Sequence, residues 1–380
     1  MDRGQCALEN MGGQVMAFSG IYSGRRVLVT GHTGFKGSWL CQWLLDLGAE
    51  VAGYSIDIPT QPSHFQALDL ESQITHTIGD VRDREALQKT FESLQPDVVF
   101  HLAAQALTRP SYDDPHSTIE TNTLGTLNVL ECIRRQNSIR AAVIITSDKC
   151  YRNDEWVWGY RENDRLGGND PYSASKACAE IICHSYMQSF FRQGHPAVAT
   201  TRAGNVIGGG DWASDRIIPD CIRAWSKGER VTIRNPYARR PWQHVLEAIS
   251  GYLCLGSSLW AGAESVRNEA FNFGPAATVI QSVEELIAEL ARHWDTAKWD
   301  IESKAETEKL ESGLLKLNCD KALHHLNWQA ILSITEAINF TGKWYNTYYS
   351  SPQSIPDLTR GQIEKYLSRA TEKELPWTAP

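Results

Sequence analysis

A regular alternation of short apolar runs with amphipathic segments, from Arg25 to about Arg202, constrains the fold of this chain most strongly. Val- and Ile-rich runs such as 26–30, 97–104 and 141–147 are apolar at consecutive positions, which is typical of strands buried on both faces. Amphipathic segments long enough for helices separate these runs. The pattern predicts an α/β fold, a Rossmann-type doubly wound parallel sheet with helices on both faces.

The same pattern predicts the individual elements. Strands are expected at 26–30, 51–55, 74–80, 97–104, 141–147 and 196–206. Helices are expected at about 38–47, 83–94, 117–135 and 171–192. Beyond residue 206, stretches rich in Gly, Pro and charge replace the buried runs, and modest helices are expected near 216–227, 245–261 and 282–294. This change of character predicts a smaller C-terminal α/β lobe that binds the substrate.

Three glycines, Gly31, Gly34 and Gly37, follow the first expected strand in a GxxGxxG spacing. Glycines in this turn let backbone N–H groups and a helix N-terminus approach a pyrophosphate, and the strand–turn–helix context indicates dinucleotide binding. Asp57, after the second strand, is placed to bind the ribose of NAD, and no arginine cluster that would favour NADP follows it. The expected NAD-binding residues are Gly31, Thr33, Gly34, Phe35, Lys36, Gly37, Asp57, Asp80, Val81, Leu102, Ala103, Ala104, Gln105, Tyr172 and Lys176.

These features suggest how the chain is divided. Residues 1–22 lack the basic start and apolar core of a signal peptide and are expected to be a loose extension, with Met11 and Met16 left open as alternative starts. Residues 23–206 form the expected NAD-binding domain, to which the segment at about 242–275 returns. Residues 207–241 and 276–350 form the expected nucleotide-sugar-binding lobe, and 351–380 a C-terminal tail.

Composition narrows the partners. A net charge of −8 and a pI of about 5.8 argue against a nucleic-acid partner, and no apolar run approaches the length of a membrane span. The nine cysteines and eleven histidines are scattered without metal-binding spacing. We expect reduced cysteines, a cytoplasmic location and no metal.

A candidate catalytic pair, Tyr172 and Lys176, lies at positions i and i+4 of the helix expected from Pro171. Asp170 is a plausible N-cap for this helix. A phenol with a pKa near 10 is a poor base at neutral pH, but a neighbouring ammonium and a positive nicotinamide lower that pKa. Ser147, at the end of the fifth strand, is followed directly by an acid and an amine.

Together the glycine turn, the strand-end hydroxyl and YxxxK resemble the extended short-chain dehydrogenase/reductase family, in members that act on nucleotide sugars. The resemblance covers about residues 24–345. Within the family, the blocks TGHTGFKGSWL, SDKCY and RAGNVIGGGDW are most similar to the 4,6-dehydratases of CDP-linked glucose. Such enzymes serve deoxysugar biosynthesis, including that of lipopolysaccharide O-antigens; the sequence leaves this chain's own pathway open.

The resemblance implies a role for each catalytic candidate. Tyr172, as phenolate, takes the proton of the sugar 4-hydroxyl, Ser147 hydrogen-bonds the same oxygen, and Lys176 holds both the phenolate and the nicotinamide ribose. Asp148 protonates the departing 6-hydroxyl. The result is dehydration of CDP-glucose to CDP-4-dehydro-6-deoxyglucose by C4 oxidation, loss of water across C5 and C6, and hydride return to C6.

Lys149 departs from the pattern, because many relatives have a glutamate there that removes the C5 proton. An amine serves as that base only in its neutral form, which burial beside a second cation favours. The alternative is that Lys149 pairs with Asp148 while another group takes the proton. We favour the base role.

The substrate lobe offers further candidates by the same resemblance. Asn205 matches a position that contacts the sugar diphosphate, and Arg240 one that binds its phosphates, with Arg239 as the weaker neighbour. The remaining phosphate or ribose candidates are Arg216 and Arg234, and Trp156, Trp212 and Trp242 are conceivable stacking partners. Asn122 and His244 are expected to be structural.

The resemblance also implies a homodimer, built from the helices at 117–135 and 171–192, that can pair further into a tetramer. Alternatives remain for the activity: a 4-epimerase, a dehydratase of a dTDP-, GDP- or UDP-sugar including a C5-inverting one, or a catalytically silent NAD-binding protein. An epimerase needs no acid–base pair for water loss, so the Asp148–Lys149 pair favours dehydration.

Overall fold

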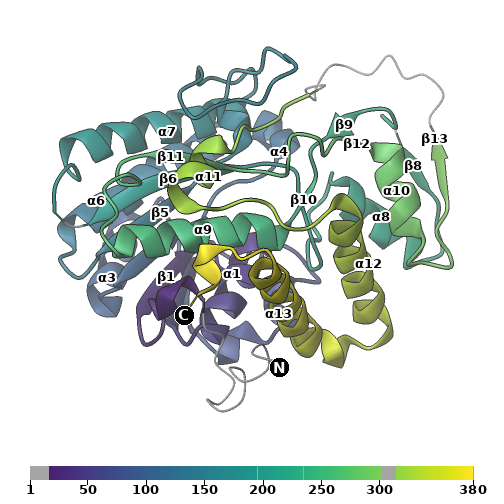
Figure 1. Cartoon of the computed structure of the whole chain (residues 1–380), viewed down its shortest axis with the longest axis horizontal. Helices are drawn as coiled ribbons and strands as arrows, with labels where there is room; N and C mark the ends of the chain where they lie inside the picture. Colours follow the sequence, from purple (N-terminus) through teal and green to yellow (C-terminus); the bar gives the residue numbers. More distant parts are fainter. Residues whose placement is uncertain (1–16, 195, 234, 302–313, 380) are drawn as a thin grey trace, which may run out of the picture.

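The computed structural model describes residues 17–194, 196–233, 235–301 and 314–379. At its centre lies a seven-stranded parallel sheet with the order β11-β6-β5-β4-β1-β2-β3 (Figure 1). The strands are β1 (Arg26–Thr30), β2 (Glu50–Ser55), β3 (Thr75–Ile78), β4 (Val98–His101), β5 (Ala141–Ile145), β6 (Ala197–Ala203) and β11 (Ala270–Phe273). The strand order reverses between β1 and β4, which is where such sheets bind ligands. The predicted fold class is confirmed.

Helices cover both faces of this sheet, because alternate residues of each buried strand point to opposite sides. Leu28 and Val99 face the cluster under one set of helices, whereas Val27 and Val29 face the other. The first set is α3 (Arg84–Leu94), α6 (Gly125–Arg135) and α7 (Pro171–Ser189). The second set includes α1 (Phe35–Asp46), α9 (Val245–Trp260) and α13 (Ile355–Glu372).

The smaller lobe lies beside the carboxyl ends of the strands, on the right in Figure 1. It is built from short strand pairs and three helices. Its strands are β7 (Val206–Ile207), β8 (Val231–Ile233), β9 (Arg239–Arg240), β10 (Gln243–His244), β12 (Gln281–Ser282) and β13 (Trp299–Ile301). Its helices are α8 (Ile217–Trp225), α10 (Val283–Ala291) and α12 (Ile334–Ser350). Short α-helices elsewhere in the described chain are α2 (His64–Ala67), α4 (Thr108–Asp113), α5 (Pro115–Ile119) and α11 (Asp320–Leu326).

Local chemistry explains where the helices begin. The Asp83 carboxylate caps α3 by accepting hydrogen bonds from the backbone of Glu85 and Ala86, at 3.1 and 3.0 Å. Asp170 caps α7 in the same way, with Pro171 at the first helical position as predicted. The predicted helix at 117–135 is interrupted by a π-helical turn over 120–124 that joins α5 to α6.

The described residues of both terminal segments pack against the rest of the protein, which the sequence did not lead us to expect. Of the extension expected at 1–22, the described part packs into the core, where Phe18 stacks on Trp377 with 5.2 Å between ring centroids. The segment expected to be a tail after residue 350 contains α13, and Tyr366 on that helix donates a 2.6 Å hydrogen bond to Glu247 on α9. The described parts of these two segments belong to one core.

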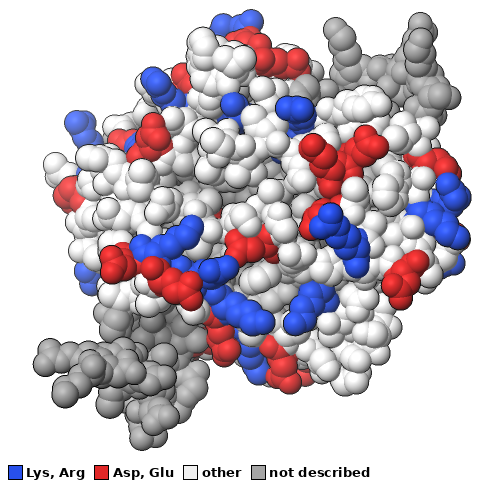
Figure 2. Space-filling model, turned by 45° about the vertical axis from the view of Figure 1, so that its right-hand side comes forward, with Lys and Arg blue, Asp and Glu red and all other residues white. Residues whose placement is uncertain are grey.

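Acidic and basic side chains are interspersed on the face shown in Figure 2. No helix in the described ranges is long and apolar enough to cross a membrane.

Candidate active site

The carboxyl ends of the parallel strands bring the predicted site residues to one edge of the large sheet. The glycine turn follows β1, and residues 102–105 follow β4 beside it. Ser147 follows β5 and Asn205 follows β6, so the chemistry candidates continue along the same edge. The fold therefore gathers residues that lie more than 170 positions apart in the sequence.

The glycine turn is closely packed. Gly31 has a φ of +76°, and a Cβ there would lie 2.6 Å from the backbone nitrogen of Ala103. At Gly37 a Cβ would lie 2.2 Å from the carbonyl oxygen of Gly31. Thr33 Oγ1 donates a 2.6 Å hydrogen bond to the carbonyl of Asp57, which ties the turn to the end of β2. Only glycine fits this cradle, which leads directly into the N-terminus of α1.

The other cofactor candidates differ in how they are engaged. The Asp57 carboxylate is exposed and has no hydrogen bond or ion pair within the described ranges. The Asp80 carboxylate accepts hydrogen bonds from the backbone and guanidinium of Arg82, at 2.9 and 2.6 Å, so an adenine contact would compete with that arginine. Val81 is buried, and its side chain packs so closely against Gly125 that a Cβ on that glycine would lie 2.7 Å from Val81 Cγ2.

Gln105 is fixed by a structural asparagine. The Asn122 side chain accepts a 2.8 Å hydrogen bond from the Gln105 backbone N–H and donates a 2.9 Å bond to Ser175 Oγ. Asn122 thereby links the end of β4 to α7, in agreement with its expected structural role. Leu102 and Ala103 are held by hydrogen bonds from their backbone N–H groups to Thr30.

Shortly after β5, Ser147 caps a 3₁₀ turn formed by Asp148–Cys150. Ser147 Oγ donates a 2.9 Å hydrogen bond to Asp148 Oδ1 and accepts one of 3.2 Å from the backbone N–H of Lys149. Asp148 is 2% exposed, and a Cβ on Gly204 would lie 2.0 Å from its Oδ2. Lys149 is half-buried, and within the described ranges no ion pair joins it to Asp148. The geometry does not support the alternative in which these two residues pair.

Tyr172 lies against this turn. Burial raises the pKa of its phenol to about 12, partly offset by a hydrogen bond with Ser147 and by the positive charge of Arg216. In the protein without NAD, burial therefore outweighs the positive charge of Arg216, and the lowering expected from the sequence also counts a positive nicotinamide.

Burial lowers the pKa of two of the three lysines at the site, Lys176 and Lys36. Burial lowers the pKa of Lys176 to about 8, against an opposing effect of Cys150 and Glu180. Burial also lowers the pKa of Lys36 to about 8, aided by Arg216 and Lys176. Lys36, expected only at the cofactor, therefore lies within electrostatic reach of the chemistry as well, and its Nζ donates a 3.5 Å hydrogen bond to Tyr252.

Asn205, one of the substrate candidates, lines a narrow cleft beside Asp148. The cleft is lined by Asp148, Gly204, Asn205, Pro241, Gly274, Pro275, Leu315 and Leu317. Arg216 donates a 2.7 Å hydrogen bond to Asp211, whose negative charge raises the pKa of the guanidinium. Because Arg216 also acts on Tyr172 and Lys36, the structure brings it to the site. Arg234 lies outside the described residues.

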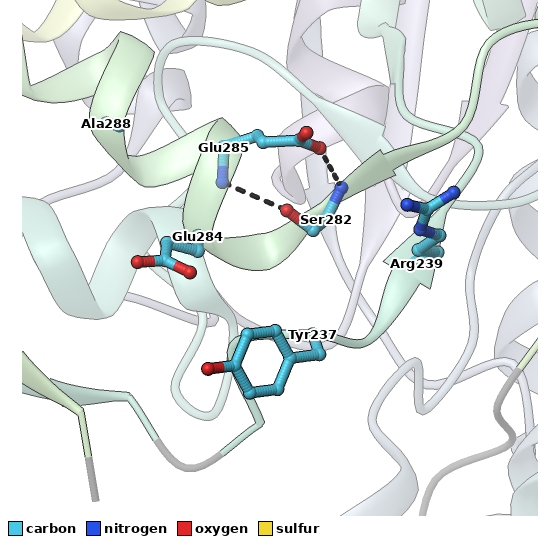
Figure 3. A pocket seen from close by; sticks show the side chains of 6 residues that line it. All are labelled: Tyr237, Arg239, Ser282, Glu284, Glu285 and Ala288. Carbon is cyan, nitrogen blue, oxygen red and sulfur yellow. Dashed lines mark hydrogen bonds between the residues drawn. The ribbon is translucent and has the colours of Figure 1, made fainter.

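Arg239 and Arg240 face opposite sides of β9, as neighbouring strand residues do. Arg239 is exposed and lines a surface hollow on the small lobe, with Tyr237 and the first turn of α10 (Figure 3). Glu285 in that hollow is committed to a capping box with Ser282, the hydrogen bonds drawn in Figure 3. Arg240 is 9% exposed and precedes Pro241 of the cleft. This arrangement favours Arg240 over Arg239 as a substrate contact.

The aromatic candidates and His244 are explained by packing. Trp212 is buried among Trp344, Tyr345 and Tyr348. Trp156 is exposed, and its ring lies tilted against that of Tyr160, with 5.0 Å between ring centroids. His244 is buried as expected, and its Nδ1 accepts a 3.3 Å hydrogen bond from the backbone of Leu246 at the start of α9.

Sequence reasoning missed a buried ion pair behind the catalytic helix. Glu180 and Arg202 are both buried, and Arg202 Nη2 donates a 2.7 Å hydrogen bond to Glu180 Oε2. The signal available in the sequence was the spacing of Glu180, four residues after Lys176 on the same helix. Its partner lies 22 residues away on another element, which no local pattern indicates.

The chain is similar in sequence and in fold to known proteins. A CDP-glucose 4,6-dehydratase of Salmonella typhimurium is 44% identical over 356 residues, covering 92% of this chain and 98% of that protein. A UDP-glucose 4-epimerase of Mycoplasma pneumoniae is 26% identical over 347 residues, covering 86% of this chain and 98% of that protein. The structure of a UDP-glucose 4-epimerase from Brucella ovis in complex with NAD has a TM-score of 0.72 at 19% identity, covering 85% of this chain and 98% of that one, and shares its fold.

The sequence model of the GDP-mannose 4,6 dehydratase family matches most of the chain. It matches residues 28–341, from within β1 to the middle of α12. This range includes the glycine turn, the Ser147–Lys149 turn and the Tyr172–Lys176 pair, so the match contains the whole candidate site. By this match and by the 44% identity above, the chain belongs to the GDP-mannose 4,6 dehydratase family.

Proposed function

We propose that this protein is an NAD-dependent nucleotide-sugar 4,6-dehydratase, a hydro-lyase that converts CDP-D-glucose to CDP-4-dehydro-6-deoxy-D-glucose. The observation that carries the proposal is the Ser147–Asp148–Lys149 turn packed against Tyr172. Ser147 and Tyr172 suit the oxidation step, and Asp148 and Lys149 suit the elimination step. The 44% identity to a CDP-glucose 4,6-dehydratase supports CDP-glucose as the substrate.

The residues present fit NAD. A side chain at Gly31 or Gly37 would fill the cradle at the N-terminus of α1, which suits close approach of a pyrophosphate to backbone N–H groups. The exposed carboxylate of Asp57, at the end of β2, suits a ribose hydroxyl. The chemistry that a bound NAD supplies is removal of hydride from sugar C4 and its return to C6.

The oxidation half rests on Tyr172, Ser147 and Lys176. Tyr172 takes the proton from the 4-hydroxyl, and Ser147 hydrogen-bonds the same oxygen. A phenol with a pKa of about 12 needs further positive charge to ionise near neutrality. Lys176, largely protonated below its pKa of about 8, is already part of this environment, so the positive nicotinamide of bound NAD would supply the further charge.

The elimination half rests on the two residues that follow Ser147. Once C4 is a ketone, the C5 proton becomes acidic, and Lys149 in its neutral form removes it. Asp148, buried against the end of β6, gives a proton to the departing 6-hydroxyl. The half-buried position of Lys149 and its lack of an ion pair with Asp148 support this division of roles.

We assign the substrate's diphosphate to the wall of the cleft formed by Asn205 and the segment that contains Arg240. Asn205 lines this cleft beside Asp148, and Arg240 precedes Pro241 in its wall. Guanidinium groups bind phosphate oxygens in a bidentate manner, which suits Arg216 and Arg240. Arg234 remains a further candidate from the sequence.

We also propose a homodimer built on α7 and the segment that precedes α6. Ile119, Leu124, Cys178 and Ile181 are exposed on these neighbouring elements. Large apolar side chains gathered on one face are typical of an interface. Ile181→Asp should give a monomer in light scattering, whereas Ile301→Asp, at an exposed apolar site on β13, should not change the oligomeric state.

The described cysteines are all free thiols, which suits a reducing cytoplasm. We therefore assign the enzyme to that compartment, where nucleotide sugars are made.

One experiment tests the activity. CDP-glucose deuterated at C4 is incubated with the protein and NAD, and the product is analysed by mass spectrometry and NMR. We expect a 4-keto-6-deoxy sugar that carries the deuterium at C6. Recovery of a 4-epimer, or of a product without deuterium at C6, would show that the assignment is wrong. Parallel incubations with dTDP-, GDP- and UDP-glucose test the choice of base.

A further inference from the structure

Glu180 on α7 is buried at 3% exposure and makes three hydrogen bonds to other elements. Its Oε1 accepts a hydrogen bond from Thr146 Oγ1. Its Oε2 accepts one from Thr200 Oγ1 at 3.0 Å and one from Arg202 Nη2 at 2.7 Å. Thr146 immediately follows β5, and the other two donors lie on β6. One carboxylate therefore joins the helix to two strand ends.

Arg202 extends the connection beyond the helix. Its Nη1 donates hydrogen bonds to Tyr151 Oη at 2.7 Å and to the carbonyl of Glu162 at 2.9 Å. The guanidinium also lies 4.9 Å from the centroid of the Tyr151 ring. Tyr151 follows the catalytic 3₁₀ turn, so the ion pair holds the chain on both sides of Asp148 and Lys149.

The position of this pair relates it to catalysis. Thr146 precedes Ser147, and Glu180 lies one helical turn after Lys176. Burying an ion pair is costly, and apolar replacements of such pairs are often neutral or stabilising. Stability alone is therefore a weak explanation for two buried charges at this place.

We propose that Glu180, held by Arg202, is a positioning residue of the dehydratase site. It fixes α7 against the Ser147 end of β5 and supplies the negative charge that keeps Lys176 protonated. The inference rests on the proposed function, because Lys176 is assigned its role there. No step of the proposed reaction transfers a proton to or from Glu180.

The charges around Lys176 support this assignment. Cys150, Glu180 and Cys183 raise its pKa. Burial raises the pKa of both thiols well above the usual value, so they are neutral at pH 7. Burial alone would raise the pKa of Glu180, but Arg202 lowers it below the ordinary value. Glu180 is thus the member of this set that is ionised.

Two other groups face Lys176 from different elements. Lys36 on α1 is a like charge, which disfavours the ammonium of Lys176. His101 on β4 is neutral, because burial and Lys176 lower its pKa to about 3. Both leave the protonated form of Lys176 dependent on Glu180.

The test compares Glu180→Gln with a matched control, Glu247→Gln. Glu247 on α9 is also buried and accepts hydrogen bonds from Tyr366 and from the backbone of Ile331 and Leu332, at 2.6, 2.8 and 2.6 Å. The titration of Lys176 is followed by NMR of ¹³Cε-lysine, with Lys176→Arg to assign the resonance. The pH profile of kcat for CDP-glucose is measured on the same proteins.

For Glu180→Gln we expect the Lys176 titration and the alkaline limb of kcat to move down by about one pH unit. We expect kcat at its optimum to fall on the order of 10- to 100-fold, with KM within about twofold, because the catalytic groups are misplaced. Glu180→Asp keeps the charge and should restore the titration. Glu247→Gln should change the melting temperature and leave both profiles as in the wild type.

An unchanged Lys176 titration and kcat profile in Glu180→Gln, with only a lower melting temperature, would overturn the inference. If Glu180→Gln does not fold, Glu180→Gln/Arg202→Met, which leaves no unpaired charge, is measured with the same expectation. A wild-type protein that fails to turn over CDP-glucose refutes the proposed function instead, and the Lys176 titration still tests Glu180 without substrate.

Discussion

Ser147 Oγ donates a 2.9 Å hydrogen bond to Oδ1 of Asp148, so the hydroxyl assigned to oxidation touches the carboxyl assigned to elimination. The same Ser147 side chain interacts with the Tyr172 phenol. The two halves of the proposed reaction are therefore carried by one connected set of side chains. A single substitution can therefore block elimination without disturbing oxidation only if it keeps the hydrogen bond between Ser147 and residue 148.

Asp148→Asn meets that condition, because the amide oxygen can still accept the hydrogen bond from Ser147. We expect C4 oxidation to continue and loss of the 6-hydroxyl to slow by about 10²- to 10⁴-fold, since the amide cannot donate an acidic proton. Reduced cofactor should then accumulate, visible by its absorbance. Ser147→Ala is the control, and it should slow the oxidation itself. Normal dehydration by Asp148→Asn would show that another group is the acid.

Lys149→Met tests the base. We expect the variant to oxidise C4 but to lose exchange of the C5 proton with solvent, because methionine fills the same space without an amine. Exchange is measured by NMR in D₂O. Lys149→Arg keeps the positive charge and cannot act as a base near neutral pH, so it should behave like Lys149→Met. Exchange and dehydration near wild-type rates in either variant would assign the proton to another residue.

The pH dependence of kcat should be bell-shaped. The positive nicotinamide of bound NAD is expected to bring the pKa of Tyr172 down from the value of about 12 that burial gives it in the protein alone. The rate then rises with pH as Tyr172 loses its proton, and it falls as Lys176 loses the charge that stabilises the phenolate. Lys176 has a pKa of about 8, so we expect the alkaline limb near pH 8. In Lys176→Arg the cation persists, and the alkaline limb should move beyond pH 9 even if kcat is lower. An alkaline limb that stays near pH 8 in Lys176→Arg would belong to another group, of which Lys36 is the first candidate.

Local patterns predicted the elements and motifs of the large sheet well. The glycine turn, the YxxxK pair and α3 are each encoded within a few turns of chain, and α3 was predicted to within a residue of its observed bounds. The cofactor cradle could be predicted because glycine is required where backbone segments meet this closely.

Long-range contacts could not be predicted in this way. The helix α13 was taken for a tail because its burial depends on α9, where Glu247 meets Tyr366 across 119 residues. The burial that raises the pKa of Tyr172 could not be predicted either, because it depends on how distant elements pack around the phenol. The Glu180–Arg202 pair was missed for the same reason.

Gly37→Ala tests the cofactor cradle. The added Cβ would lie 2.2 Å from the carbonyl oxygen of Gly31, so the turn must move away from the N-terminus of α1. We expect NAD affinity, measured by calorimetry, to fall at least about 100-fold, since backbone N–H groups lose their positions. Gly361→Ala on α13 is the control, because a Cβ there meets nothing within 4 Å. Equal NAD affinity in the two variants would exclude the turn as the pyrophosphate site.

Glu247 makes a separate prediction about stability. Burial raises its pKa from 4.5 to about 7, so the folded protein holds this proton more tightly than the unfolded chain does. The contribution is fully present below pH 4.5 and is lost as the pH rises through 7. Its size is about 3 kcal/mol at 1.36 kcal/mol per pKa unit.

The measurement is the free energy of unfolding by urea from pH 4.5 to 8, for the wild type and Glu247→Gln. The difference between the two removes the effect of other titrating groups, such as Asp46, whose pKa burial raises to about 6. Glutamine stays neutral throughout. The free energy of unfolding of Glu247→Gln should therefore rise by about 3 kcal/mol relative to that of the wild type as the pH rises from 4.5 to 8. A difference that does not change with pH would mean that folding does not raise the pKa of Glu247, so that its hydrogen bonds from Tyr366, Ile331 and Leu332 offset the effect of burial.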